Sequence, residues 1–98
     1  MLKSICIYCG ANFNGDAGLL KLIEDLAKVL VDHSIEVVYG GGKVGVMGLI
    51  ADEVLKRNGT VKGVIPGFLM DKEVGHTGVT ELIITESMHQ RKQKMAEL

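Results

Sequence analysis

The sequence has little of several residue classes. Its 98 residues contain no tryptophan, four other aromatic residues, one proline and two cysteines. Four aromatic side chains are too few for the stacking platforms of a protein that binds single-stranded nucleic acid. Two cysteines cannot form the disulfide framework of a small secreted domain. No apolar run approaches the ~18 residues of a membrane span, and the run at residues 5–9 is too short for the core of a signal peptide.

Neither sign of charge dominates. Eleven Lys and Arg residues stand against twelve Asp and Glu residues, so the net charge of −1 gives no basic field for a phosphate polymer. With 47% hydrophobic residues, 23% charged residues and 13 glycines, the composition is that of a globular domain. We therefore expect one cytoplasmic domain over residues 1–98 that has neither a nucleic acid polymer nor a membrane as its partner.

Short apolar runs alternate with amphipathic stretches along the chain. The runs at 3–8, 36–39, 61–65 and 82–85 predict strands, and residues 66–78 predict a loop with one helical turn. The spacing at 16–33 predicts a helix, a second helix ends at Asn58-Gly59, and a third begins at Ser87 with a capping box completed by Gln90. Strands without polar alternation are buried on both faces. The order predicts an α/β fold, the N-terminal half of a Rossmann-like, doubly wound parallel sheet. Because no helix-ending residue follows 95–98, we expect the domain to be truncated there.

A glycine-rich turn joins the second strand to the second helix. It contains a G-x-G-x-x-G pattern in Gly40, Gly42 and Gly45, and Gly48 allows close packing of helix on sheet. Glycines let the backbone approach a phosphate, which the helix dipole stabilises, and Lys43 adds a cation. The alternative is a tight turn without a ligand. No acidic residue ends the next strand and no P-loop lysine-serine/threonine pair is present, which argues against NAD and against an NTPase.

Arg91 lies on the apolar side of the third helix, three residues after Met88 and four before Met95. A cation in that phase needs a partner, and we interpret it as gathered for an anion; the alternative is a solvated charge. The polar loop 71–78 leaves the carboxyl edge of the sheet, where ligands bind in open parallel sheets, and makes Glu73 a candidate acid.

The C-x-x-C pair at Cys6 and Cys9 does not begin a helix, so core packing is the better interpretation than thiol chemistry. The three histidines, His33, His76 and His89, are scattered and give no zinc spacing. Cys9 and Gly10 end the first strand and can line a pocket with backbone groups.

The combination of these motifs resembles the Lonely Guy (LOG) family of cytokinin-activating phosphoribohydrolases, which often carry a lysine decarboxylase label. The likeness covers essentially the whole chain in order, through Cys9-Gly10, the segment 38–48, the strand end 63–66 and the segment 88–92. It implies hydrolysis of the N-glycosidic bond of a nucleoside 5′-monophosphate, such as a cytokinin riboside monophosphate or AMP, to free base and ribose 5-phosphate. It also implies a homodimer without metal or organic cofactor.

The resemblance assigns roles to particular residues. Arg91 and Glu73 match catalytic positions, and the matches to substrate and phosphate positions are Lys92, Gly40, Gly41, Gly42, Gly45, Met47, Gly48, Cys9 and Gly10. Family enzymes also carry a P-G-G-x-G-T-x-x-E motif, which is absent from these 98 residues. Cleaving the bond requires a carboxylate as well as cations, so we expect the isolated polypeptide to be inactive or nearly so. Two alternatives stay open, a nucleotide-binding module without catalysis and a half-domain that only pairs with another chain. Decarboxylation of lysine finds no support, because no pyridoxal phosphate site is recognisable.

Overall fold

A computed structural model describes residues 3–7, 17–43, 45–70 and 75–98. Its elements in chain order are β1 (Ser4–Cys6), α1 (Ala17–Asp32), β2 (Glu36–Tyr39), α2 (Gly45–Lys56), β3 (Val61–Pro66), the single-turn 3-10 helix η1 (Gly67–Leu69), β4 (Glu81–Thr85) and α3 (Met88–Glu97). The predicted order of strands and helices is confirmed, including the one helical turn after the third strand. Among the residues described here, no helix has the length and apolar character needed to cross a bilayer.

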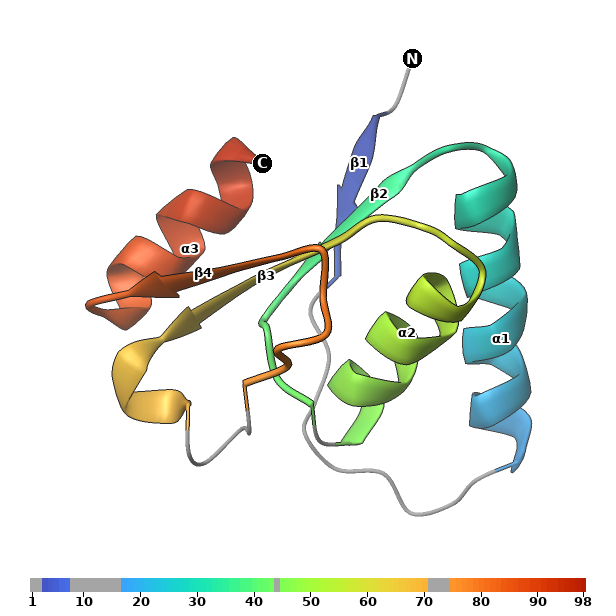
Figure 1. Cartoon of the computed structure of the whole chain (residues 1–98), viewed down its shortest axis with the longest axis horizontal. Helices are drawn as coiled ribbons and strands as arrows, with labels where there is room; N and C mark the ends of the chain where they lie inside the picture. The colour runs from blue at the N-terminus through green and yellow to red at the C-terminus, as the bar shows by residue number, and fades with distance from the viewer. Residues whose placement is uncertain (1–2, 8–16, 44, 71–74) are drawn as a thin grey trace.

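The four strands form one sheet in the order β1-β2-β3-β4, and every neighbouring pair is parallel (Figure 1). The pairing of β2 with β3 ends at Tyr39 and Gly63, whereas β3 stays paired with β4 to the end of both strands. The sheet therefore opens between β2 and β3 at its carboxyl edge.

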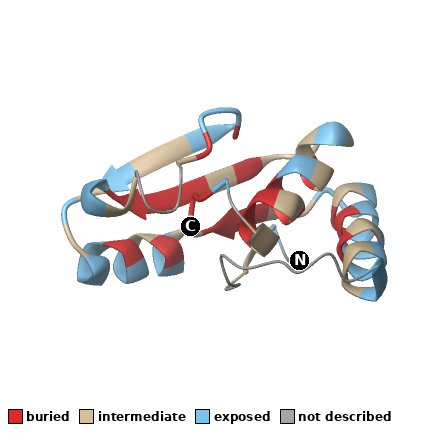
Figure 2. Cartoon of the chain, turned by 90° about the horizontal axis from the view of Figure 1, so that it is seen from below, coloured by how far each residue is buried: buried red, intermediate tan, exposed pale blue. Residues whose placement is uncertain are grey.

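Helices cover both faces of the sheet, as the doubly wound prediction requires. Val37 and Tyr39 of β2 belong to the larger core cluster, which also contains the buried residues of α1 and α2. Val38 points to the opposite face, where it packs with Val64 and Met95 of α3. Figure 2 shows these buried residues along the central strands and on the helix sides that face them. The α/β parallel sheet with flanking helices is thus confirmed.

The helix ends follow local chemistry. α1 is closed by Ser34 and α2 by Asn58, both in the left-handed conformation, with φ of 55° and 63°. At the start of α3 the Ser87 hydroxyl accepts a hydrogen bond from the Gln90 amide at 3.1 Å. The Gln90 side chain reaches back to the amide of Glu86 at 2.8 Å, one residue earlier than in the standard capping box.

Candidate functional site at the carboxyl edge of the sheet

The Arg91 side chain is buried between α3 and the sheet, with 9% of its surface exposed. Its Nε donates to the carbonyl of Val64 at 2.9 Å, and its Nη2 donates to the carbonyl of Gly40 at 2.5 Å. Its Nη1 lies 3.9 Å from the sulfur of Met88. The expected inward phase of Arg91 on its helix is therefore confirmed. What the sequence did not indicate is that its first partners are main-chain carbonyls.

Those two carbonyls lie where the sheet opens. Gly40 follows the last residue of β2, and Val64 lies just beyond the last pairing of β3 with β2. The guanidinium therefore supplies hydrogen bonds at a point where the strands no longer pair with each other. A Cβ at Gly40 would lie 2.5 Å from Arg91 Nη2 and 3.2 Å from Met47 Sδ, so no larger residue fits without displacing the arginine. The structure thus brings Arg91, Gly40 and Met47 together.

The glycine-rich turn then leads into α2. Gly41 and Gly45 have φ of +79° and +61°, a conformation that glycine adopts without strain. A Cβ at Gly48 would lie 1.8 Å from the carbonyl oxygen of Lys43, so the helix can start this close to the turn only with glycine there. Because α2 begins at Gly45, its first amides and the positive end of its dipole follow directly on the glycine-rich turn. The Gly40 carbonyl of the same turn accepts the hydrogen bond from Arg91. This is the electrostatic setting expected of an anion site.

A short segment, Gly75–Gly78, lies across the turn, and we call it the strap. Gly75 pairs with Gly42 in an isolated antiparallel bridge, and the His76 amide donates to the carbonyl of Gly41 at 2.9 Å. The hydroxyl of Tyr39 donates to the carbonyl of Gly42 at 2.8 Å. The carbonyls of Gly40, Gly41 and Gly42 are thus each held by a donor from a different element.

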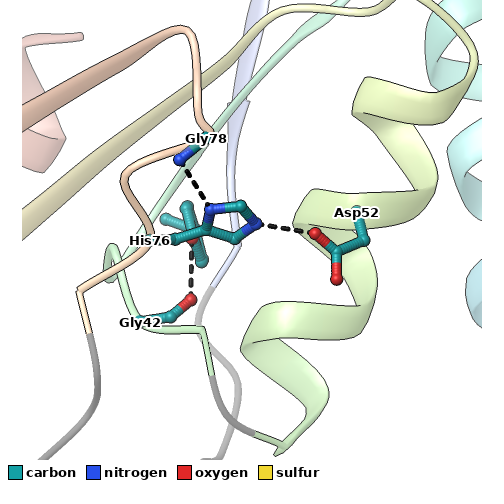
Figure 3. Close-up of polar contacts among 5 residues, drawn as sticks. Gly42, Asp52, His76 and Gly78 are labelled. Atoms are coloured by element: carbon teal, nitrogen blue, oxygen red, sulfur yellow. Dashed lines mark hydrogen bonds and ion pairs between the residues drawn. The ribbon is translucent and has the colours of Figure 1, made fainter.

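The imidazole of His76 ties the strap to α2. Its Nδ1 accepts a hydrogen bond from the amide of Gly78 at 3.0 Å, and its Nε2 lies 2.6 Å from Oδ1 of Asp52 (Figure 3). Since Nδ1 is an acceptor, the neutral ring carries its proton on Nε2 and donates it to the carboxylate. The ring is buried, whereas Asp52 is exposed. Sequence reasoning missed this pair, because the two residues lie 24 positions apart and no spacing connects them.

The other residues predicted for the site fall into two groups, exposed lysines and residues outside the described part of the chain. Lys92, on α3, and Lys43, in the turn, are both exposed. Cys9, Gly10 and Glu73 lie outside the described residues. Within the described part of the chain, no group of three or more His, Cys, Asp or Glu side chains is arranged to hold a metal ion.

Sequence comparisons show which known proteins the chain is similar to. A family model described as "Possible lysine decarboxylase" matches residues 47–98, more than half of the chain. The cytokinin riboside 5'-monophosphate phosphoribohydrolase of Rhodococcoides fascians is 41% identical over 97 residues, which are 98% of this chain and 49% of that protein. The probable cytokinin riboside 5'-monophosphate phosphoribohydrolase LOGL1 of Oryza sativa subsp. japonica is 46% identical over 92 residues, 94% of this chain and 41% of that protein.

Solved structures with the same fold are more distant in sequence. The structural genomics target TM1055 superimposes with a TM-score of 0.71 at 24% identity, over 99% of this chain and 56% of its own. The Moco carrier protein from Chlamydomonas reinhardtii gives a TM-score of 0.67 at 23% identity, over 92% of this chain and 53% of its own. The chain thus spans half or less of the length of the curated relatives it matches. Because the family model covers more than half of the chain, the chain belongs to the family described as "Possible lysine decarboxylase", and the names of its relatives agree with the resemblance to the Lonely Guy (LOG) family.

Proposed function

We propose that the protein acts in the hydrolysis of the N-glycosidic bond of nucleoside 5′-monophosphates, releasing free base and ribose 5-phosphate. This chain contributes the phosphate-binding part of the site, formed by the glycine turn, the start of α2 and Arg91. The observation that carries the proposal is the hydrogen bond from Arg91 Nη2 to the carbonyl of Gly40. It brings a buried guanidinium to the turn that the family resemblance assigns to substrate. The names of the relatives supply the reaction type.

The reaction adds water to the anomeric carbon while the base leaves with a proton. Its transition state carries positive charge on the ribose ring, so a carboxylate has to stabilise that charge or activate the water. Glu73 is the candidate in this chain. The protein orients the substrate through its phosphate group. The free amides at the start of α2, together with Lys92, supply the positive field that attracts this phosphate.

A second candidate function is a module that binds the nucleotide without cleaving it. It is favoured by the two hydrogen bonds that the Arg91 guanidinium makes to main-chain carbonyls. A guanidinium engaged in this way shapes the turn that binds the nucleotide, which is a role in binding and not in cleavage. The family resemblance also leads us to propose a homodimer, whose mass can be measured by sedimentation.

One pair of measurements separates these functions. AMP binding is measured by calorimetry and free adenine by chromatography, for the unaltered chain and for Lys92→Ala. We expect that variant to bind AMP about tenfold more weakly, which corresponds to loss of one charge-assisted contact of about 1.5 kcal/mol. Lys94→Ala, a change of the same type on the same helix, serves as the control.

The outcomes are distinct. AMP binding with adenine release supports the hydrolase. Because these 98 residues alone are expected to be inactive or nearly so, binding without release is followed by the same assay on a chain that also carries the P-G-G-x-G-T-x-x-E motif, where continued absence of release supports the module. Absence of AMP binding, or an equal loss in Lys92→Ala and Lys94→Ala, would contradict both.

A further inference from the structure

One flank of α1 is apolar, in addition to the inward side that fills the core. Ile23, Ala27 and Leu30 are its buried residues. On the flank about 100° round the helix from these, Leu22, Leu26 and Val29 expose 63%, 39% and 52% of their surface. Their spacing of four and three residues aligns them in one row along the helix. Figure 2 shows that the side of α1 away from the sheet is exposed. We call Leu22, Leu26 and Val29 the apolar row.

A row of charges runs beside it. Lys21, Asp25, Lys28 and Asp32 follow one another at spacings of four, three and four residues, so they lie in a second row next to the apolar one. We call these four the charged row. Their side chains are between 57% and 76% exposed. Within the helix, Lys21 lies 3.5 Å from Asp25 and Lys28 lies 2.9 Å from Asp32. Read along α1, the signs are plus, minus, plus, minus.

This order of signs changes into its opposite when the helix is reversed. A two-fold axis perpendicular to a pair of antiparallel helices keeps both charged rows on the same side of the contact. It brings Lys21 opposite Asp32 of the second copy, and Asp25 opposite Lys28 of the second copy. In a parallel pair the two charged rows would lie on opposite sides and would not meet. The charge pattern is therefore complementary to itself in the antiparallel arrangement.

We propose that α1 packs in an antiparallel, two-fold symmetric contact on α1 of a second copy of this chain, with the apolar rows in the centre and the charged rows bridging along one side. The proposal rests on the homodimer proposed above and adds the surface and the register; it is independent of the chemistry at the glycine turn. A single pair of 16-residue helices buries less than the roughly 1,200 Å² of a standard stable interface. The contact by itself is therefore expected to be weak and concentration-dependent.

Charge-swapped variants test the contact. Lys21→Asp with Lys28→Asp makes the charged row wholly acidic, and Asp25→Lys with Asp32→Lys makes it wholly basic. By sedimentation equilibrium each variant alone is expected to associate at least tenfold more weakly than the unaltered chain, whereas an equimolar mixture of the two associates again. Circular dichroism checks that α1 is still folded. Recovery in the mixture cannot come from a variant that has lost its fold.

The apolar row is tested by Leu26→Gln, which is expected to weaken association in every combination. Ile84→Gln serves as the control, because Ile84 is an exposed apolar residue on a different element, β4. Variants that dimerise as the unaltered chain does would overturn the α1 contact and leave the homodimer in place on another surface. If the unaltered chain stays monomeric, the α1 contact and the homodimer are both overturned. In that case another segment or another protein covers α1. AMP binding by the same variants is expected to be unchanged, so a failure here is distinguishable from a failure of the proposed function.

Discussion

Replacing Arg91 with alanine removes two donors from main-chain carbonyls, that of Val64, which is buried, and that of Gly40, which is partly buried. A hydrogen bond made by a charged group is worth about 1.5 to 3 kcal/mol, and the abandoned acceptors stay inside the protein. The lower value for each bond gives a loss of about 3 kcal/mol in the free energy of unfolding. This is a large share of the roughly 5–15 kcal/mol that stabilises a typical domain. Urea denaturation followed by circular dichroism measures it.

Two further variants separate the hydrogen bonds from packing. Arg91→Met keeps most of the apolar stem and loses both bonds, so we expect it to retain only the packing part of the stability. Lys21→Ala is the control, because Lys21 pairs with Asp25 on the surface and its loss is expected to cost less than about 1 kcal/mol. A loss below about 1 kcal/mol for Arg91→Ala would refute the idea that the guanidinium holds the open end of the sheet together.

Three other changes have defined outcomes. Ser34→Gly relieves a left-handed serine at the end of α1 and is expected to raise the free energy of unfolding by about 1 kcal/mol, measured in urea. Asp52→Ala removes the acceptor of His76 Nε2 and is expected to lower it by about 1 kcal/mol, a value reduced because Asp52 is exposed, whereas Asp52→Asn retains most of the bond. The hydrogen bond from Lys28, aided by its charge, lowers the pKa of Asp32 below the ordinary 3.8. The contribution of this pair to the stability of the fold is therefore present above pH 3.8 and is lost as the pH falls through the lowered pKa. Carboxyl NMR titration of Lys28→Met is expected to show the Asp32 pKa returning upward; an unchanged value would contradict the assignment.

Much of the fold followed from local pattern. β2 was predicted with its observed bounds, because the strand formers Val37, Val38 and Tyr39 follow one another between two helix signals. The left-handed end of α2 followed from Asn58, a residue that tolerates positive φ. The same geometry at Ser34 was not expected, since serine has no such preference; the turn is closed by the Ile35 amide, which donates to the carbonyl of Leu30 at 2.8 Å.

The site was predictable only in part. The phase of Arg91 within α3 indicated that the side chain points inward, and the motif indicated that the glycine turn lies at the same edge of the sheet. Its bond to Gly40 joins residues 51 positions apart, and no local pattern carries that information. The pair of His76 and Asp52 stayed hidden for the same reason. Met47 came from the resemblance alone, and the structure places its sulfur beside the space that a side chain at residue 40 would need.

The opening between β2 and β3 also bears on the order in which the chain assembles. The acceptors of the Arg91 side chain, on Val64 and Gly40, come next to each other only after those two strands have paired. Before that moment the last helix has no place to dock, and contacts so distant along the chain carry the largest loop-closure cost. We therefore expect α3 to join the sheet late, so that substitutions within it accelerate unfolding and leave the rate of folding nearly unchanged.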